Sequence, residues 1–142
     1  MHKLDFQTML PHRKPMLMIS EVLSYDDQQL EALSLIEPAN PLLQDDGRFP
    51  GFATLELLAQ ASGLFLGLNL AGSAEPGAIV SVRHMHIFKS SLGVDKPIHV
   101  KVNFLGGSGS AAMFQGLAYQ EDVLVSDATL TVSQFKEGEA DA

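Results

Sequence analysis

Glu56 and Gln60 are the side chains in this sequence best placed to do chemistry. They lie in an apolar stretch, residues 52–70, whose other polar side chains are few. Because they are four residues apart, a helix would place them one turn from each other on the same face. A carboxylate in apolar surroundings is costly to keep charged, and such a group can act as an acid or base near neutral pH. A simpler reading, in which Glu56 reaches solvent at a helix edge or caps a backbone group, fits the sequence equally well.

The stretch that carries these two residues, 47–70, predicts a helix in the middle of a hydrophobic core. It opens with the turn sequence GRFPG at residues 47–51 and continues as a segment that is apolar on nearly every helical face. Gly72 and Pro76 follow it, and glycine and proline just past a helix are ordinary stop signals.

The rest of the chain predicts strands around this helix. Short apolar or alternating runs bounded by turn residues indicate strands at 16–25, 30–36, 78–90, 97–105, 110–119 and 123–135. The sequence also predicts an irregular connection at 37–46, a flexible loop at 106–109 and a hairpin turn at 120–122. One helix cannot cover both faces of six strands. We therefore expect an α+β fold, in which a strongly curved antiparallel sheet wraps round the helix and leaves an edge for a dimer partner.

Length, charge and cysteine content narrow the class of protein. The 142 residues predict a single domain, 1–142, with a frayed acidic tail at 136–142. The net charge of −8 makes nucleic acid and anionic lipid poor partners. The chain has no cysteine, no apolar run typical of a signal peptide, and a clean apolar run at 61–70 that is too short to cross a membrane. We expect a soluble, cytoplasmic protein.

Three motifs resemble one enzyme family. Residues 10–15 (LPHRKP) are similar to the LPHRxP segment of FabZ-type 3-hydroxyacyl-acyl carrier protein (ACP) dehydratases, residues 47–51 (GRFPG) to their GHFPG, and residues 55–61 (LELLAQA) to their LEAxAQ helix. The spacing also fits, and the resemblance covers most of the chain. It implies the hotdog fold, which agrees with the order of elements predicted above.

The resemblance implies a division of catalytic roles. In that family the GHFPG histidine removes the α-proton of a 3-hydroxyacyl thioester, and a carboxylate from the other protomer's central helix protonates the leaving hydroxyl. A backbone N–H at a helix N-terminus polarises the thioester carbonyl. Carried over, Glu56 is the acid, Gly51 supplies the amide, and Gln60 supports Glu56 or contacts the substrate.

The same resemblance implies the ligand and the partners. Arg48, Phe49 and Pro50 would contact the substrate, an acyl thioester on the phosphopantetheine arm of ACP, and no cofactor or metal is implied. Arg48 could bind the phosphopantetheine phosphate, although an internal salt bridge with Asp45 or Asp46 is slightly favoured. His12 is expected to be a structural hydrogen-bonding residue.

The chain departs from the family where it matters most, because Arg48 occupies the histidine position and arginine is a poor general base. The favoured account is a heterodimeric dehydratase, in which a histidine-bearing hotdog paralogue supplies the base and this chain supplies Glu56. This arrangement resembles the ApeP-type proteins of aryl polyene biosynthesis clusters. A hotdog thioesterase that uses Glu56 and water, and a non-catalytic subunit that binds acyl carriers, are the alternatives for function. A homodimer is the alternative to the heterodimer.

A pair of histidines and a set of three apolar residues also suit binding or packing roles. His84 and His86 alternate along a predicted strand and face one side, which would suit a metal, but two ligands are not a site and the sequence indicates no group to complete them. An ordinary or interfacial histidine pair is the favoured reading. Phe52, Leu58 and Phe65 are expected in the core or along an acyl tunnel.

Overall fold

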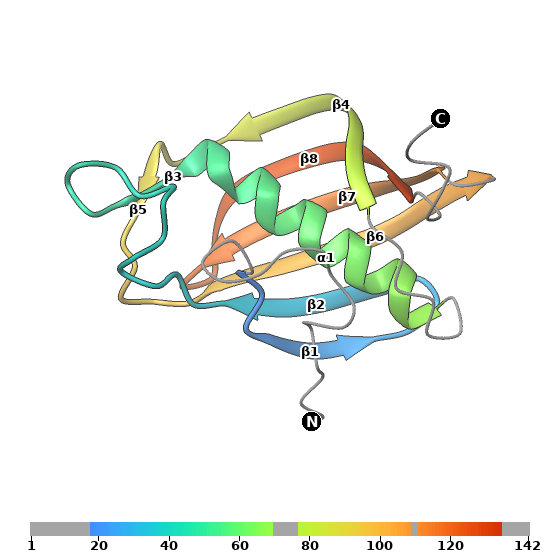
Figure 1. Cartoon of the computed structure of the whole chain (residues 1–142), viewed down its shortest axis with the longest axis horizontal. Coiled ribbons are helices and arrows are strands. Elements are labelled where there is room, and N and C mark those ends of the chain that lie inside the picture. The colour runs from blue at the N-terminus through green and yellow to red at the C-terminus, as the bar shows by residue number, and fades with distance from the viewer. Residues whose placement is uncertain (1–17, 70–76, 109–110, 135–142) are drawn as a thin grey trace.

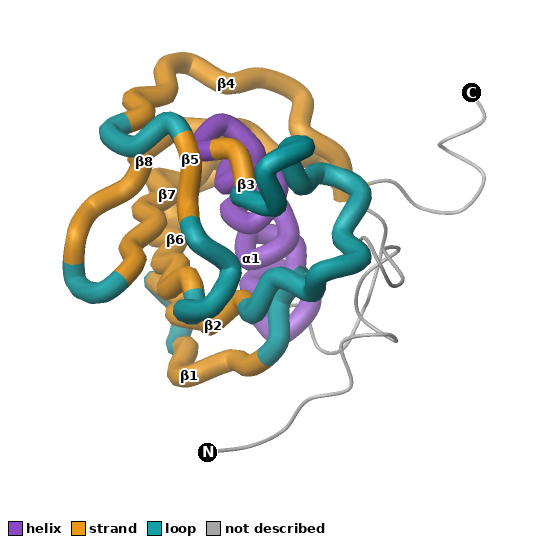
Figure 2. The backbone as a smooth tube through the Cα atoms, turned by 90° about the vertical axis from the view of Figure 1, so that its left-hand side faces the viewer, coloured by secondary structure: helices purple, strands orange, loops and turns teal. Residues whose placement is uncertain are grey.

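The computed structural model describes residues 18–69, 77–108 and 111–134, and the structural statements below refer to these residues. Six antiparallel strands form one sheet in the order β1-β2-β6-β7-β8-β4 (Figure 1). The strands are β1 (Glu21–Tyr25), β2 (Gln29–Ser34), β4 (Gly77–Ile87), β6 (Ile98–Ser108), β7 (Ala111–Gln120) and β8 (Val123–Gln134). Viewed from its end, the sheet curves around the single helix α1 (Thr54–Asn69) (Figure 2). The hotdog fold and its α+β class are confirmed.

The central helix is buried on most of its circumference. Its buried side chains include Leu57, Leu58, Ala61, Leu64 and Phe65. The single-turn 3-10 helix η2 (Gly51–Ala53) precedes it, so the regular α-helix begins two residues later than predicted. At the other end, Asn69 Nδ2 donates to Phe65 O at 3.0 Å and to Asp26 O at 3.2 Å, which ties the helix terminus to the β1–β2 turn.

Helix and sheet meet without a gap because small residues face the helix. A Cβ atom added at Gly116 of β7 would lie 2.8 Å from Leu58 Cδ1, so a larger residue there would push α1 away from the sheet. Phe65 stacks on Phe104 with ring centroids 5.4 Å apart and meets Phe114 edge-on at 5.5 Å. These contacts define a dense core between the helix and the concave face of the sheet.

We expect Leu64→Ala to lower the free energy of unfolding by about 2–5 kcal/mol, because Leu64 is fully buried and its loss would leave a cavity. Urea denaturation monitored by circular dichroism measures this. Leu35→Ala is the matched control: Leu35 is 55% exposed, and its truncation should change stability by less than about 0.5 kcal/mol. Equal losses in both variants would contradict this description of the core.

The predicted loop at 106–109 was wrong over its described part. β6 continues through Gly106 and Gly107 to Ser108, with a register irregularity between Phe104 and Gly106. Gly106 has a φ of 127°, so it absorbs a bulge inside the strand rather than ending it, and Gly107 continues the regular pairing with β7. The predicted β7–β8 hairpin is confirmed, and its two turn residues, Glu121 and Asp122, have φ of 51° and 64°.

The edge strand β4 carries apolar side chains that the chain itself leaves exposed. Among the described strands, β4 pairs with β8 alone. Val82, Ile87 and Phe88 are 37%, 45% and 57% exposed, and Phe52 at the start of the helix is 63% exposed. Phe52, Leu58 and Phe65 were all predicted to lie in the core or along an acyl tunnel. Leu58 and Phe65 are buried in the core, whereas Phe52 lies outside it. An apolar edge of this kind is typical of a surface that another subunit covers.

By length and composition the helical segment Gly51–Asn69 could cross a membrane. However, 67% of its most apolar window is buried inside the fold. Within the described part of the chain, that burial indicates the core helix of a soluble fold, as expected from the sequence.

Candidate functional site

Glu56 and Gln60 form a hydrogen-bonded pair in the first half of α1. Gln60 is 1% exposed, and its Nε2 donates to Glu56 Oε1 at 3.2 Å. The other end of the same amide, Oε1, accepts the Met18 backbone N–H at 2.9 Å. The amide therefore joins the segment before β1 to the carboxylate. Glu56 itself is half-buried and lies in the first turn of the helix, where the helix dipole favours negative charge.

Gln60→Met should lower the free energy of unfolding by about 1–3 kcal/mol, because methionine keeps the volume but leaves the buried Met18 N–H without its acceptor. Thermal or urea denaturation measures the loss. Gln115→Met, at an exposed position on β7, is the control and should stay within about 0.5 kcal/mol of the wild type. A wild-type stability for Gln60→Met would show that the Met18 bond does not hold this segment.

The turn before the helix is held by backbone contacts that only glycine allows. A Cβ atom at Gly51 would collide with the Lys89 carbonyl oxygen and lie 2.9 Å from Ile87 Cγ2. In this close approach the Gly51 N–H donates to Ser90 O at 2.8 Å. The amide expected to polarise a thioester is thus already paired, and that role, which stays a prediction, requires the substrate oxygen to replace Ser90 O.

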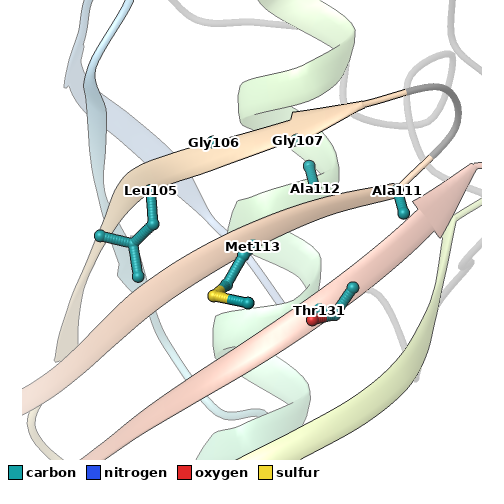
Figure 3. Close-up of a pocket in the computed structure, with 7 residues that line it drawn as sticks. All are labelled: Leu105, Gly106, Gly107, Ala111, Ala112, Met113 and Thr131. Carbon is teal, nitrogen blue, oxygen red and sulfur yellow. The ribbon is translucent and has the colours of Figure 1, made fainter.

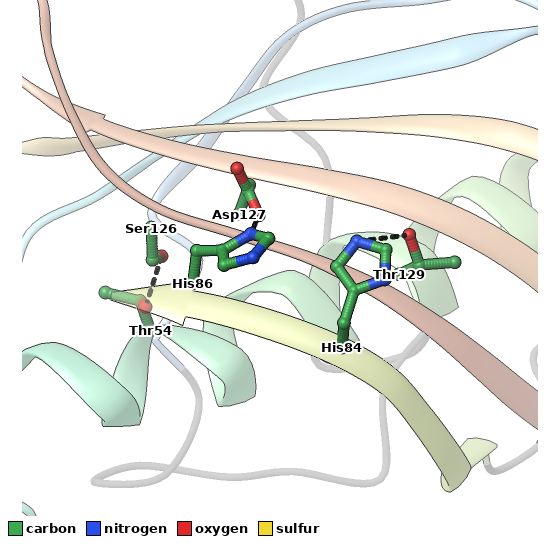
Figure 4. A network of polar contacts seen from close by, with 6 residues as sticks. All are labelled: Thr54, His84, His86, Ser126, Asp127 and Thr129. Atoms are coloured by element: carbon green, nitrogen blue, oxygen red, sulfur yellow. Dashed lines mark hydrogen bonds and ion pairs between the residues drawn. The ribbon is translucent and has the colours of Figure 1, made fainter. Parts of the chain in front are cut away.

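A buried hydroxyl pair anchors the start of the helix to the sheet. Thr54 Oγ1 donates to Gly51 O at 2.7 Å and lies 2.7 Å from Ser126 Oγ on β8 (Figure 4). Both side chains are fully buried, so each hydroxyl satisfies the other. Sequence reasoning missed this pair because residues so distant in the sequence show no local pattern.

Phe49 and Pro50, which were expected to contact the substrate, take part in a short strand pair. They form β3 (Phe49–Pro50), which pairs with β5 (Ser91–Leu92). Phe49 has no exposed surface and Pro50 is buried, so the geometry favours packing over substrate contact for Phe49. Their role as substrate-binding residues remains a prediction.

Arg48 is exposed, and its guanidinium is directed to β5 rather than to the neighbouring carboxylates. Its Nε donates to Ser91 Oγ at 2.8 Å and its Nη2 to Ser91 O at 3.2 Å. Asp46 Oδ1 instead accepts the Arg48 backbone N–H at 3.0 Å. Among the described contacts the expected ion pair with Asp45 or Asp46 is therefore replaced by bonds to Ser91.

The structure joins Glu56 to Gln60 in the first half of the central helix, and places Gly51 in η2 directly before that helix and Arg48 on the loop that leads to it. His12 and the rest of the 10–15 motif lie outside the described residues. A hollow on the outer side of the sheet, lined by Leu105, Gly106, Gly107, Ala111, Ala112, Met113 and Thr131, contains none of these site residues (Figure 3).

A family model described as ApeP-like, ApeP dehydratase, matches residues 4–141. The chain belongs to the ApeP-like dehydratase family. The predicted resemblance to FabZ-type dehydratases and to ApeP-type members is thereby confirmed, and the chain is a dehydratase-like subunit.

Individual relatives agree with this assignment. The ApeP-like chain is 27% identical to the 3-hydroxyacyl-ACP dehydratase FabZ of Cronobacter sakazakii, over 96% of this chain and 95% of the relative. Its fold is similar to a chain of the dehydratase heterocomplex ApeI:P from Xenorhabdus doucetiae, with a TM-score of 0.90, 20% identity and coverage of 99% and 97%. A hypothetical thioesterase from Streptococcus pneumoniae shares the fold at a TM-score of 0.62 and 16% identity, covering 81% and 84%.

Proposed function

We propose that this chain is the carboxylate-bearing subunit of a heterodimeric dehydratase that acts on 3-hydroxyacyl thioesters of ACP. The observation that carries the proposal is the pair Glu56–Gln60: a half-buried carboxylate held in place by a buried amide, in a chain whose histidine position is Arg48. The chain therefore offers an acid without the base that the same reaction needs, and a partner subunit's histidine supplies that base.

The proposed reaction divides two proton transfers between two subunits. The partner's imidazole takes the proton from C2 of the acyl chain, and the electron pair moves into the thioester carbonyl. As the C2–C3 double bond forms, the C3–O bond breaks, and Glu56 gives a proton to the departing hydroxyl, which leaves as water. The Gly51 N–H, released from Ser90 O, stabilises the oxygen that gains negative charge.

The described histidines support the need for an external base. His86 and His84 lie on the outer side of the sheet beside Asp127 and Thr129, and His99 lies 3.7 Å from Glu31. None of these three imidazoles is therefore placed to serve the start of α1.

His84 and His86 belong to β4, whose exposed apolar residues suit an interface with a second hotdog subunit, and the similar ApeI:P structure is itself a heterocomplex. We place the enzyme in the cytoplasm.

The test is a dehydration assay on 3-hydroxyacyl-ACP in which mass spectrometry detects the enoyl product. It compares the chain alone, a GHFPG-bearing hotdog homologue of the same genome alone, and their purified complex. We expect the complex to exceed either chain alone by at least tenfold. Dehydration by this chain alone at the rate of the complex would refute the split site, release of free acid would indicate a thioesterase, and carrier binding without turnover would indicate a non-catalytic subunit.

A further inference from the structure

Two imidazoles and a carboxylate converge on the outer face of the sheet at its β4 edge. His84 and His86 belong to β4, and Asp127 belongs to β8, where it stands directly opposite His86 in the strand register. Figure 4 shows both imidazoles on one side of β4, leaning towards β8. One possible ligand atom from each of the three residues lies within 4.8 Å of the others. The sequence did not indicate Asp127 as a third ligand, because only the pairing of β4 with β8 brings it beside His86.

A backbone irregularity sets this arrangement. Simple alternation would place Val82, His84 and His86 on one face of β4. A register shift between Val82 and His84 breaks the alternation, so that Val82 pairs with Leu130 on one face of the sheet while His84 pairs with Thr129 on the other. Bulges of this kind re-aim side chains and are over-represented beside functional sites. Here the bulge places Val82 on the opposite face of β4 from the two histidines.

The three groups are accessible and already lie close together. His86 Nδ1 is 2.8 Å from Asp127 Oδ1, and the two imidazole centroids are 5.4 Å apart. The side chains of His86 and Asp127 are 61% and 24% exposed, which leaves room for an ion and for water beside it. His84 Nε2 lies 3.3 Å from Thr129 Oγ1, a contact long enough to be exchanged.

We propose that His84, His86 and Asp127 bind a divalent transition metal of the zinc class. Two imidazole nitrogens and one carboxylate oxygen are ligands that zinc takes, and a site with three protein ligands keeps a fourth position for water. Tetrahedral bonds of about 2.0–2.1 Å place ligand atoms roughly 3.3 Å apart. Small rotations of the three side chains reach this spacing, because the ion takes the place of the hydrogen bond that joins His86 Nδ1 to Asp127 Oδ1.

Such a site would cross-link β4 to β8. Because β4 is the edge strand, carries the exposed Ile87 and is followed directly by the exposed Phe88, a bound ion would restrain the surface that a second subunit covers. The proposal is independent of the dehydratase chemistry, since it concerns the outer side of the sheet and none of the groups around Glu56.

The experiment is a titration of the metal-free full chain with Zn²⁺ against a chromogenic chelator at pH 7.5, and with Co²⁺ for its visible absorption. We expect one equivalent of metal to bind per chain, and the bound Co²⁺ to show the visible absorption of a tetrahedral site. His84→Gln, His86→Gln and Asp127→Asn should each weaken binding at least tenfold, as losses at metal sites usually do. Circular dichroism should show unchanged folding, because the substituted side chains lie at the surface.

The chain contains five histidines, so the other three need a control. The triple variant His2→Gln/His12→Gln/His99→Gln should bind Zn²⁺ with unchanged affinity. No stoichiometric binding by the wild type would overturn the proposal. So would equal binding by the double variant His84→Gln/His86→Gln.

Discussion

Glu56→Gln is expected to lower the dehydration rate of the two-subunit complex by about 10²- to 10⁴-fold, the usual contribution of a positioned general acid or base. Glutamine keeps the size of the side chain and an oxygen that Gln60 Nε2 can still donate to, but it has no proton to give to the leaving hydroxyl. The measurement is enoyl-ACP formation at saturating substrate, with the partner subunit unchanged.

The control for this variant is Glu31→Gln. Glu31 is a half-buried carboxylate on β2, and it lies 3.7 Å from His99 and 3.8 Å from Lys101 on the opposite side of the sheet from the helix. Its loss removes the same charge from the chain and should leave turnover within twofold of the wild type. If Glu56→Gln retains full activity while the complex still needs both subunits, this chain contributes something other than the acid.

Gly51→Ala is expected to destabilise the chain by about 3 kcal/mol, the upper end of the usual range for overpacking. The added methyl group would meet the Lys89 backbone carbonyl, which cannot move aside as the tip of a flexible side chain could. The bond from the Gly51 N–H to Ser90 O would also be strained, and with it the start of the helix. Urea denaturation measures the loss.

Gly67→Ala, inside α1, provides a matched control. A Cβ atom at Gly67 would meet nothing within 4 Å, so the methyl group fits without displacement. Alanine is also favoured over glycine inside a helix by roughly 0.5–1 kcal/mol, so this variant should be as stable as the wild type or more stable. A similar loss of stability in both variants would show that residues 87–90 do not pack closely against Gly51.

The sequence was sufficient for the parts of the fold that follow from local periodicity. A helix apolar on nearly every face had to be central, and alternating runs of the right length had to be strands around it, so a curved sheet wrapped round one helix followed. The resemblance to a known family then implied the hotdog fold. The ends of elements were less predictable. Gly106 and Gly107 resemble a loop in the sequence, but strand pairing with β7 retains them in β6.

At the site, the sequence indicated Glu56 and Gln60 through their helical spacing, and the structure joins them by a hydrogen bond. What it could not indicate were contacts made across the fold. Met18 reaches Gln60 through a backbone N–H, which leaves no trace in residue type, and the Thr54–Ser126 pair depends on how β8 packs against the helix. The bulge in β4 likewise depends on pairing with β8, so simple alternation could not indicate it.

The exposed apolar edge at β4 should affect how much of this protein accumulates in a cell. A chain with an uncovered edge strand and large exposed apolar side chains tends to self-associate and to be degraded by cellular proteases. Chains made in excess of the subunit that covers this edge should therefore be cleared, while chains made in balance persist. We expect the steady-state level of this protein to follow the synthesis of its partner, so that subunit stoichiometry is set by degradation as well as by expression.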